Sequence, residues 1–171
     1  MRRTLLLIGL LALAGSFALG QKQTRRGSTN AAQSDLRPTY ERWVDQDVAY
    51  IITPEEKRAF LLLKTDVERE TFIEQFWRVR DSKPTGNQNA YRAEHYRRIA
   101  YANQNYSSDK VPGWKTARGH VYIILGQPDE VRKISAGEVW LYRHAPGFGT
   151  NVEIEITREA DPNGFRVLKN P

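Results

Sequence analysis

The sequence has 171 residues, of which 40% are apolar and 27% are charged. This composition suits a single domain with one core. The chain contains no cysteine, which excludes disulfides, thiol catalysis, zinc–thiolate sites and a lipid-modified cysteine. The formal net charge of +6 falls by two when Arg2 and Arg3 are left out. For an exported protein, such a basic excess favours anionic envelope surfaces over nucleic acid, so we expect no nucleic-acid partner.

The first twenty residues have the three parts of a secretory signal peptide. Arg2 and Arg3 precede an apolar run from Leu5 to Leu13, and a small-x-small cleavage site ends at Gly20. A bilayer-spanning helix needs about 20 apolar residues, and this run is shorter. We therefore predict a signal peptide at 1–20, export to the periplasm or the medium, and no transmembrane segment after cleavage.

The next segment, residues 21–37, is polar and shows no periodic apolar pattern. It is predicted to be a flexible basic linker. The folded domain is then expected to cover residues 38–171.

Two capping boxes mark helix starts in the first half of this domain. Thr53 is followed by Pro54 and by Glu56, and Thr65 is followed three residues later by Glu68. The sequence therefore predicts one helix from Pro54 and a second that ends near residue 80. A short helix and then an extended piece are expected before them, over 40–52.

Apolar residues at helical spacing define the inner faces of the later helices. In the second capped helix they are Phe72, Ile73, Phe76 and Trp77. A third helix is predicted over 90–105, and its apolar arc consists of Tyr91, His95, Ile99, Ala102 and Tyr106.

After the Pro112-Gly113 turn the apolar pattern changes to a period of two, which is typical of strands. The predicted strands cover 119–125, 138–144, 152–157 and 165–168. Short connections between them favour an antiparallel meander. The expected fold is α+β, with N-terminal helices packed on one face of a C-terminal antiparallel sheet of about four strands.

The two faces of this predicted sheet differ in chemistry. One face is aliphatic and is expected to meet the helices. The other would carry Tyr122, Trp140 and Tyr142 beside Glu138, Glu153 and Glu155. If exposed, such a face would bind sugar rings or peptide; the alternative is that residues 43–52 cover the aromatic rings.

The stretch Gly113-Trp114-Lys115-Thr116-Ala117-Arg118-Gly119 resembles the signature of the GWxTD domain family. Similar segments include Phe76-Trp77-x-x-Arg80-Asp81 and Glu138-x-Trp140-x-Tyr142, so the resemblance extends from about Trp43 onward. The family is one of exported bacterial proteins, and the resemblance implies no established activity. The final Asp of the motif is replaced by Ala117, so a role that needs this carboxylate is not carried over.

This signature suggests a binding site where the last helix meets the first predicted strand. Trp114 would stack on a ligand, while Thr116 and Arg118 would donate hydrogen bonds, with Arg80 and Asp81 beside them. In the structural alternative, Trp114 fills the junction between helices and sheet, and Arg118 pairs with a carboxylate such as Asp81 or Asp129.

The histidines offer two interpretations. His95 lies on an apolar stripe, which is typical of a buried, hydrogen-bonded core histidine. If 119–125 paired with 138–144, His95, His120 and His144 would converge as for a catalytic zinc, although the spacing does not require this. We expect no metal and no cofactor.

The sequence shows no P-loop, dinucleotide fingerprint or nucleophile elbow. We therefore expect an exported, non-catalytic cell-envelope module that binds a protein or an envelope polymer. The alternative is a hydrolase of envelope glycan or peptide that uses Asp81, His95, Asp129 and Glu130. Neither the identity of the partner nor the oligomeric state follows from the sequence.

Overall fold

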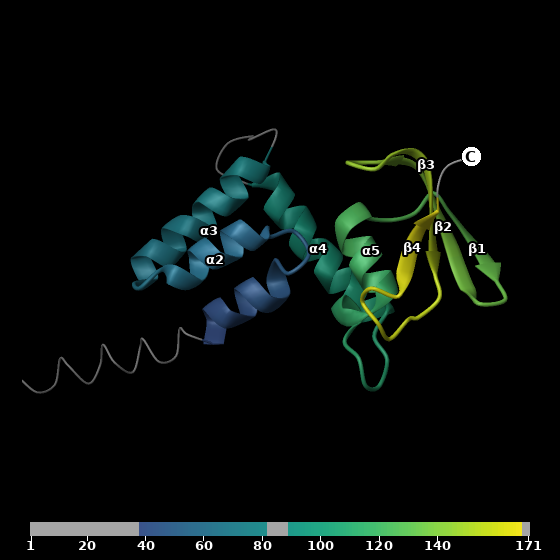
Figure 1. The fold of residues 1–171 in the computed structure, drawn as a ribbon, viewed down its shortest axis with the longest axis horizontal. Helices are drawn as coiled ribbons and strands as arrows, with labels where there is room; N and C mark the ends of the chain where they lie inside the picture. The colour runs from purple at the N-terminus through teal and green to yellow at the C-terminus, as the bar shows by residue number, and fades with distance from the viewer. Residues whose placement is uncertain (1–37, 82–88, 169–171) are drawn as a thin grey trace, which may run out of the picture.

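The computed structural model describes residues 38–81 and 89–168. The predicted signal peptide at 1–20 and the predicted linker at 21–37 lie outside the described residues. Helices come first and a four-stranded antiparallel sheet follows, so the predicted α+β class is confirmed. Figure 1 shows a helical part at one end, the sheet at the other, and helices α4 and α5 between them.

The helical part contains both of the predicted capped helices. The side chain of Thr53 caps α2 (Pro54–Leu62), and the side chain of Thr65 caps α3 (Asp66–Arg80). In each capping box the threonine oxygen accepts from the backbone N–H of the glutamate, which accepts in return from the threonine N–H. These reciprocal bonds satisfy donors that a helix start leaves unpaired, and they confirm the predicted helix starts.

The segment before α2 differs from the prediction. Residues 38–42 are helical and run into a π-helical turn, η1 (Trp43–Asp47). The predicted extended piece is wrong, because the chain then turns on itself. The N–H groups of Ile51 and Ile52 both donate to the carbonyl of Val48.

Aromatic packing holds the helical part together. Trp43 meets Phe60 with ring centroids 4.8 Å apart and meets Phe76 edge-on at 5.2 Å. The buried residues of this core are Tyr40, Trp43, Val44, Val48, Phe60, Ile73, Phe76 and Trp77. The predicted inner face of α3 is confirmed for Ile73, Phe76 and Trp77.

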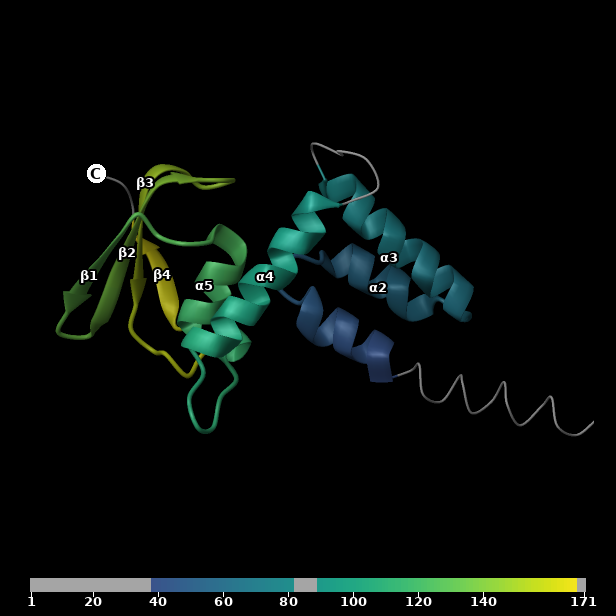
Figure 2. The same ribbon diagram turned by 180° about the vertical axis from the view of Figure 1, so that it is seen from behind.

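Helix α4 (Ala90–Asn105) connects the helical part to the rest of the fold, and Figure 2 shows it running from the end of α3 to the side of α5. Its first part packs on the helical core through Tyr96. Further along, Ile99 and Ala102 form a separate small cluster with Ile123 of α5. One helix thus supplies apolar side chains to both halves of the molecule.

The predicted strand 119–125 is wrong, since these residues belong to helix α5 (Ala117–Leu125). Thr116 caps this helix by accepting from the N–H of Gly119. The helix is buried on two sides. Ala117 and Val121 belong to the cluster shared with the sheet, whereas Ile123 packs on α4 and the Tyr122 ring stacks on Tyr101 of α4 at 4.4 Å. A helix that is apolar on several sides gives a continuous apolar run, which the sequence does not distinguish from a buried strand.

The sheet has the order β1-β2-β3-β4, formed by β1 (Glu130–Ile134), β2 (Gly137–Ala145), β3 (Gly149–Ile156) and β4 (Phe165–Leu168). The predicted meander is therefore present, but its first strand is the charged segment Glu130–Ile134. This segment, and not 119–125, pairs with β2, with Val131 opposite Trp140.

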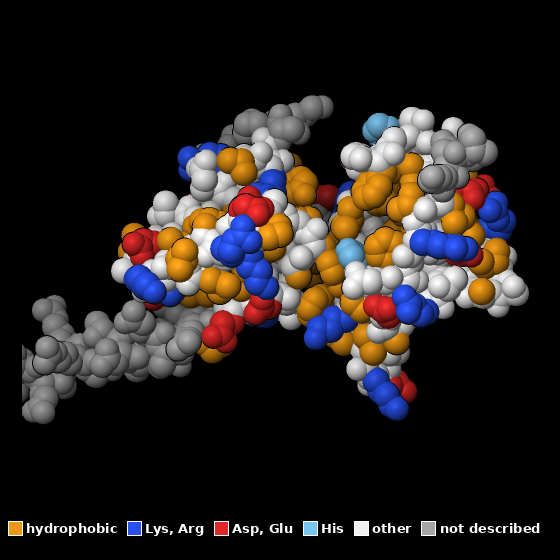
Figure 3. All heavy atoms as spheres, in the orientation of Figure 1, with side chains coloured by type: hydrophobic (Ala, Val, Ile, Leu, Met, Phe, Trp, Pro, Cys, Tyr) orange, Lys and Arg blue, Asp and Glu red, His pale blue; other side chains and the backbone are white. Residues whose placement is uncertain are grey.

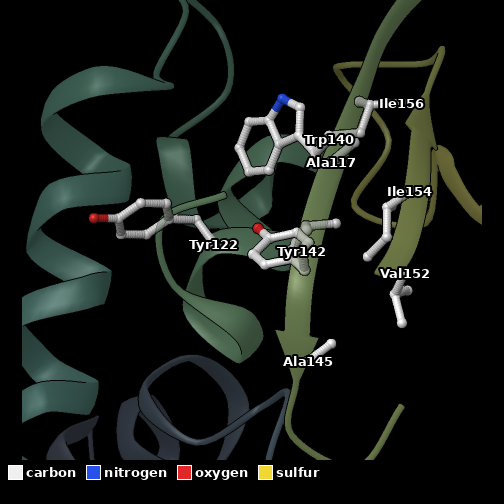
Figure 4. Close-up of a cluster of buried hydrophobic side chains, with 9 residues drawn as sticks. Ala117, Tyr122, Trp140, Tyr142, Ala145, Val152, Ile154 and Ile156 are labelled. Atoms are coloured by element: carbon white, nitrogen blue, oxygen red, sulfur yellow. The ribbon is translucent and has the colours of Figure 1, made fainter. Parts of the chain in front are cut away.

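The predicted composition of the sheet faces is right for Glu138, Trp140 and Tyr142, which share one face, and wrong for Tyr122, Glu153 and Glu155. Trp140 lies opposite Ile154, and Tyr142 lies opposite Val152, so the rings share a face with aliphatic residues of β3. Figure 4 shows Trp140 and Tyr142 directed to the same side as Ala117 of α5. Helix α5 covers the aromatic rings on this face, together with Tyr106, the residue that follows α4. The alternative prediction that residues 43–52 cover these rings is therefore wrong.

The opposite face of the sheet is charged. Val139 and Leu141 lie there in register with Arg132, Glu153 and Glu155. Glu153 pairs with Arg132 at 3.3 Å, and Glu155 pairs with Arg166. The rings and the carboxylates of Glu153 and Glu155 thus point to different sides of the sheet, and no mixed aromatic and acidic face is formed by these residues.

Three backbone segments approach very closely where α4, η2 (Gly113–Lys115) and α5 meet. A Cβ atom at Gly113 would lie 1.9 Å from the Ala102 carbonyl oxygen. A Cβ atom at Gly119 would lie 1.8 Å from the Gly113 carbonyl oxygen. Only glycine fits at either position without movement of the backbone, and the two glycines therefore fix the distance from α4 to α5.

We predict that Gly119→Ala destabilises the protein by roughly 2–4 kcal/mol because the added methyl group overpacks this contact. At an ordinary position inside a helix, replacement of glycine by alanine stabilises a protein by about 1 kcal/mol. A decrease in the free energy of unfolding would therefore indicate the close backbone contact. Urea unfolding followed by circular dichroism measures the difference.

Gly147→Ala is the matched control. Nothing lies within 4 Å of a Cβ atom there, but φ is +80°, so the change should cost only about 1 kcal/mol of backbone strain. A Gly119→Ala variant as stable as Gly147→Ala would show that the close contact does not constrain the fold.

Candidate functional site

The motif residues 113–119 form the corner between α4 and α5. Trp114 is half-buried and packs against the cluster of Ile99, Ala102 and Ile123. Its backbone N–H donates to Asn103 Oδ1 at 3.0 Å, and its carbonyl accepts from the Tyr50 hydroxyl at 2.8 Å. The indole thus occupies the junction between α4 and the segment before α2.

Thr116 is buried and makes two hydrogen bonds within the corner. Its hydroxyl donates to the Gly113 carbonyl at 2.8 Å and accepts from the Gly119 N–H at 3.0 Å. A single side chain therefore ends the η2 turn and begins α5. This double use needs a hydroxyl. An aliphatic side chain of similar size would leave the Gly119 N–H unpaired, whereas the Gly113 carbonyl would keep its bond from the Thr116 N–H at 3.1 Å.

Arg118 pairs with two carboxylates that were not predicted as its partners. Its Nε lies 2.9 Å from Glu159 Oε2 and 3.7 Å from Glu138 Oε2. Trp140 Nε1 donates to the same oxygen of Glu138 at 3.0 Å. The expected pairing of Arg118 with a carboxylate is present, but the named examples Asp81 and Asp129 are wrong, because the loop between β3 and β4 brings Glu159 to the corner.

Glu159 is the most perturbed carboxyl group of the corner. Both of its oxygens are shielded from solvent, although 38% of its side-chain surface is exposed. Burial raises the pKa of this carboxyl above its usual value, and the Arg118 charge opposes that shift. The Arg118–Glu159 contact is an ion pair by distance but not a well-directed hydrogen bond.

Ala117 replaces the acidic residue of the motif at the first position of α5. Its side chain is fully buried, and its N–H donates to the Glu159 carbonyl at 3.0 Å. A carboxylate at this position would lie next to the backbone of Glu159 and within the same enclosed corner. The carboxylates that the corner does contain come from β2 and from the β3–β4 loop.

A second group joins the corner to the N-terminal segment. The ring of Tyr50 stacks on the ring of His120 at 3.7 Å, with 13° between their planes. His120 Nδ1 donates to the Pro162 carbonyl at 2.7 Å, and Phe165 meets the imidazole edge-on. Sequence analysis missed this group because its members lie far apart along the chain and show no periodic pattern.

Arg80 and Asp81, the other predicted binding residues, lie at the end of α3. Arg80 donates to Glu56 at 2.7 Å and to the Ile51 carbonyl at 3.0 Å, and its guanidinium lies over the Phe76 ring. Asp81 is the C-cap residue of α3. Arg80 thus holds the segment 48–52 from the side of the helical part, whereas Trp114 holds it from the side of the corner.

The residues predicted for a hydrolase occupy separate parts of the fold. His95 is buried, and its Nε2 donates to the Asp47 carbonyl at 2.7 Å. Burial lowers the pKa of His95, as expected for a neutral core histidine. Asp129 accepts from the Arg143 N–H at the start of the sheet, and Glu130 is an exposed residue of β1.

The convergence of three imidazoles does not occur. His95 and His120 are each bound to a different backbone carbonyl, and His144 lies exposed on β2. Among residues 38–81 and 89–168, no group of three or more histidine, aspartate and glutamate side chains is arranged to hold a metal ion. In the same part of the chain, no helix is both long enough and apolar enough to cross a bilayer.

The model of the GWxTD domain family matches residues 16–167, and the chain belongs to this family. Comparisons with curated proteins and with solved structures gave no match. The family signature coincides with the corner that joins α4, α5 and the sheet.

We predict that Arg118→Met destabilises the protein by about 1–2 kcal/mol at pH 7. Removing one partner of a buried pair costs about 3–5 kcal/mol, and the effect is discounted here because 36% of the Arg118 side chain is exposed. The loss should shrink as the pH falls. Removal of Arg118 raises the already elevated pKa of Glu159 further. A carboxyl whose pKa is higher in the folded state favours folding most when it is protonated, so at low pH the variant loses less stability relative to the wild type.

Urea unfolding at pH 7 and at pH 4.5 tests this expectation, with Arg158→Met as the control. Arg158 pairs with Asp161 in the same loop, but 71% of its side chain is exposed, so its replacement should change stability by less than about 0.5 kcal/mol. An equal loss at both pH values would contradict a charged contact between Arg118 and Glu159.

Proposed function

We propose that this chain is an exported, non-catalytic module of the cell envelope that binds a protein or an envelope polymer. The observation that carries the proposal is the internal pairing of the family signature. Arg118 is paired with Glu138 and Glu159, and the Thr116 hydroxyl is bound to two backbone groups. Because these side chains already have partners within the fold, they stabilise the junction between helices and sheet. A binding partner would then contact other surfaces of the protein.

Export rests on the first twenty residues. The two arginines, the apolar run and the small residues before Gln21 have the order of a secretory signal. The absence of cysteine in the sequence makes the fold independent of the redox state of its compartment. The first feature supports a place in the periplasm or outside the cell, and the second is compatible with it.

One observation favours the alternative, a hydrolase of envelope glycan or peptide. Glu138 and Glu159 both approach Arg118, and burial raises the pKa of Glu159, as in paired carboxyls that share acid and base roles. A substrate would have to reach the Glu159 oxygens, however, and these are shielded from solvent. The contact with Arg118 also favours a charged carboxylate over a proton donor.

The proposal is tested with the full chain produced in a bacterial host. We expect it to be found outside the cytoplasm with Gln21 as its first residue, and to be retained on a purified envelope fraction. The same fraction should release no new glycan or peptide fragments when incubated with the wild type. Fragments released by the wild type but not by Glu159→Gln would overturn the module in favour of the hydrolase.

A further inference from the structure

The surface around Tyr40, at the outer side of the helical part, has two neighbouring hollows. Tyr40 lines both of them. The acidic groove, about 580 Å³ in volume, lies between Tyr40 and the side of α3 that runs from Asp66 to Arg78. The second hollow, called the apolar pocket, has a volume of about 160 Å³. It is lined by the apolar side chains of Tyr40, Val44, Phe60 and Leu61 and by the charged residues Glu41, Asp45 and Arg69.

The acidic groove carries an excess of negative charge. It is lined by three carboxylates, Asp66, Glu70 and Glu74, and by one guanidinium, Arg78. Asp66 pairs with Arg69 at 3.1 Å, so a partner would meet mainly the charges of Glu70 and Glu74. A cationic partner would therefore be attracted to this side of α3.

Glu70 and Glu74 are only weakly neutralised within the fold. Glu70 accepts from the hydroxyl of Tyr40 at 2.9 Å, which satisfies an oxygen but cancels no charge. Glu74 lies 3.8 Å from Arg92, and 66% of its side chain is exposed. Like charges four residues apart on a helix repel each other, so a cation bound between them would be favoured.

Apolar side chains lie exposed beside the same groove. Val67 lines the acidic groove and is 77% exposed, and Leu61 lines the neighbouring apolar pocket and is 59% exposed. Figure 3 shows apolar side chains at the surface of the helical part among charged ones. The apolar pocket is similar in volume to an engineered cavity of about 150 Å³ that holds benzene, so it would accept one aliphatic or aromatic side chain.

We propose that Tyr40, Leu61, Val67, Glu70 and Glu74 form a docking surface for a cationic amphipathic peptide segment of a partner protein. An apolar side chain of the segment enters the pocket beside Leu61, and its lysine or arginine side chains lie along Glu70 and Glu74. This arrangement corresponds to a helix laid in a groove, with apolar anchors and a charged flank. The inference rests on the proposed binding function and names the partner class within it.

The probe is a 15-residue synthetic peptide with leucines at helical spacing and lysines at the remaining positions. A second peptide has glutamate in place of every lysine. Titration of each peptide into the isotopically labelled full chain, followed by NMR, locates binding residue by residue. We expect the lysine peptide to shift the amides of Val67, Glu70, Thr71 and Glu74, and the glutamate peptide to leave them unchanged.

The double variant Glu70→Gln/Glu74→Gln should weaken binding of the lysine peptide at least tenfold, and Leu61→Ser should weaken it about fivefold. The matched control is Glu153→Gln/Glu155→Gln, which changes the net charge equally, but on the charged face of the sheet. It should leave the affinity within twofold. Raising the salt from 50 to 300 mM should weaken the wild-type interaction, because the charges lie near solvent.

Shifts centred on the sheet, equal losses for both double variants, or no loss for Glu70→Gln/Glu74→Gln would overturn the docking surface. Shifts of the same amides that depend on protein concentration without peptide would overturn it as well, because they would indicate a second copy of the chain. The envelope experiment separates the two proposals. If Glu70→Gln/Glu74→Gln is retained on the envelope fraction like the wild type, the module stands and this surface is wrong.

Discussion

The fold depends on the close approach of three backbone segments at Ala102, Gly113 and Gly119. A side chain larger than hydrogen at either glycine would place its Cβ within 2 Å of a carbonyl oxygen. This contact leaves no room for side chains, so α4, η2 and α5 pack backbone against backbone and form one unit. The sheet packs on this unit through Ala117 and Val121 of α5.

Polar contacts extend this unit in both directions along the chain. Toward the N-terminus, the Tyr50 hydroxyl reaches the Trp114 carbonyl while its ring stacks on His120. Toward the C-terminus, the Ala117 N–H and the Arg118 side chain both hold Glu159. At the far end of α5, Arg98 donates to the Ile124 carbonyl, and the Tyr142 hydroxyl donates to the Gly126 carbonyl. Helix α5 is thus connected to each neighbouring element by at least one directed bond.

The helix starts could be predicted from sequence because their determinants are local. Thr53 with Glu56 and Thr65 with Glu68 satisfy one another within four residues, so no tertiary context alters them. Helix α5 could not be predicted in this way, because its burial on two sides removes the polar face that identifies a helix. The register of β2 on β3 was equally out of reach, since alternation within a strand does not decide which residues lie opposite each other.

The candidate site shows the same limit. The sequence singled out Trp114, Thr116 and Arg118 as one group because they lie close together in the chain, and the structure places all three at the corner. It missed Glu159 and Tyr50, which reach the corner from the β3–β4 loop and from the segment before α2. The signature marks where the helical part and the sheet are joined, and the hollows around Tyr40 lie on a different surface.

Amide hydrogen exchange tests most directly whether the signature corner is a structural junction. The N–H groups of Trp114, Ala117, Gly119 and His120 are all bound within the corner. If the corner holds the fold together, these amides should exchange only through global unfolding, with the same free energy as the core amides of β2 and β3. Rapid exchange of these amides in a protein whose sheet remains protected would contradict the account.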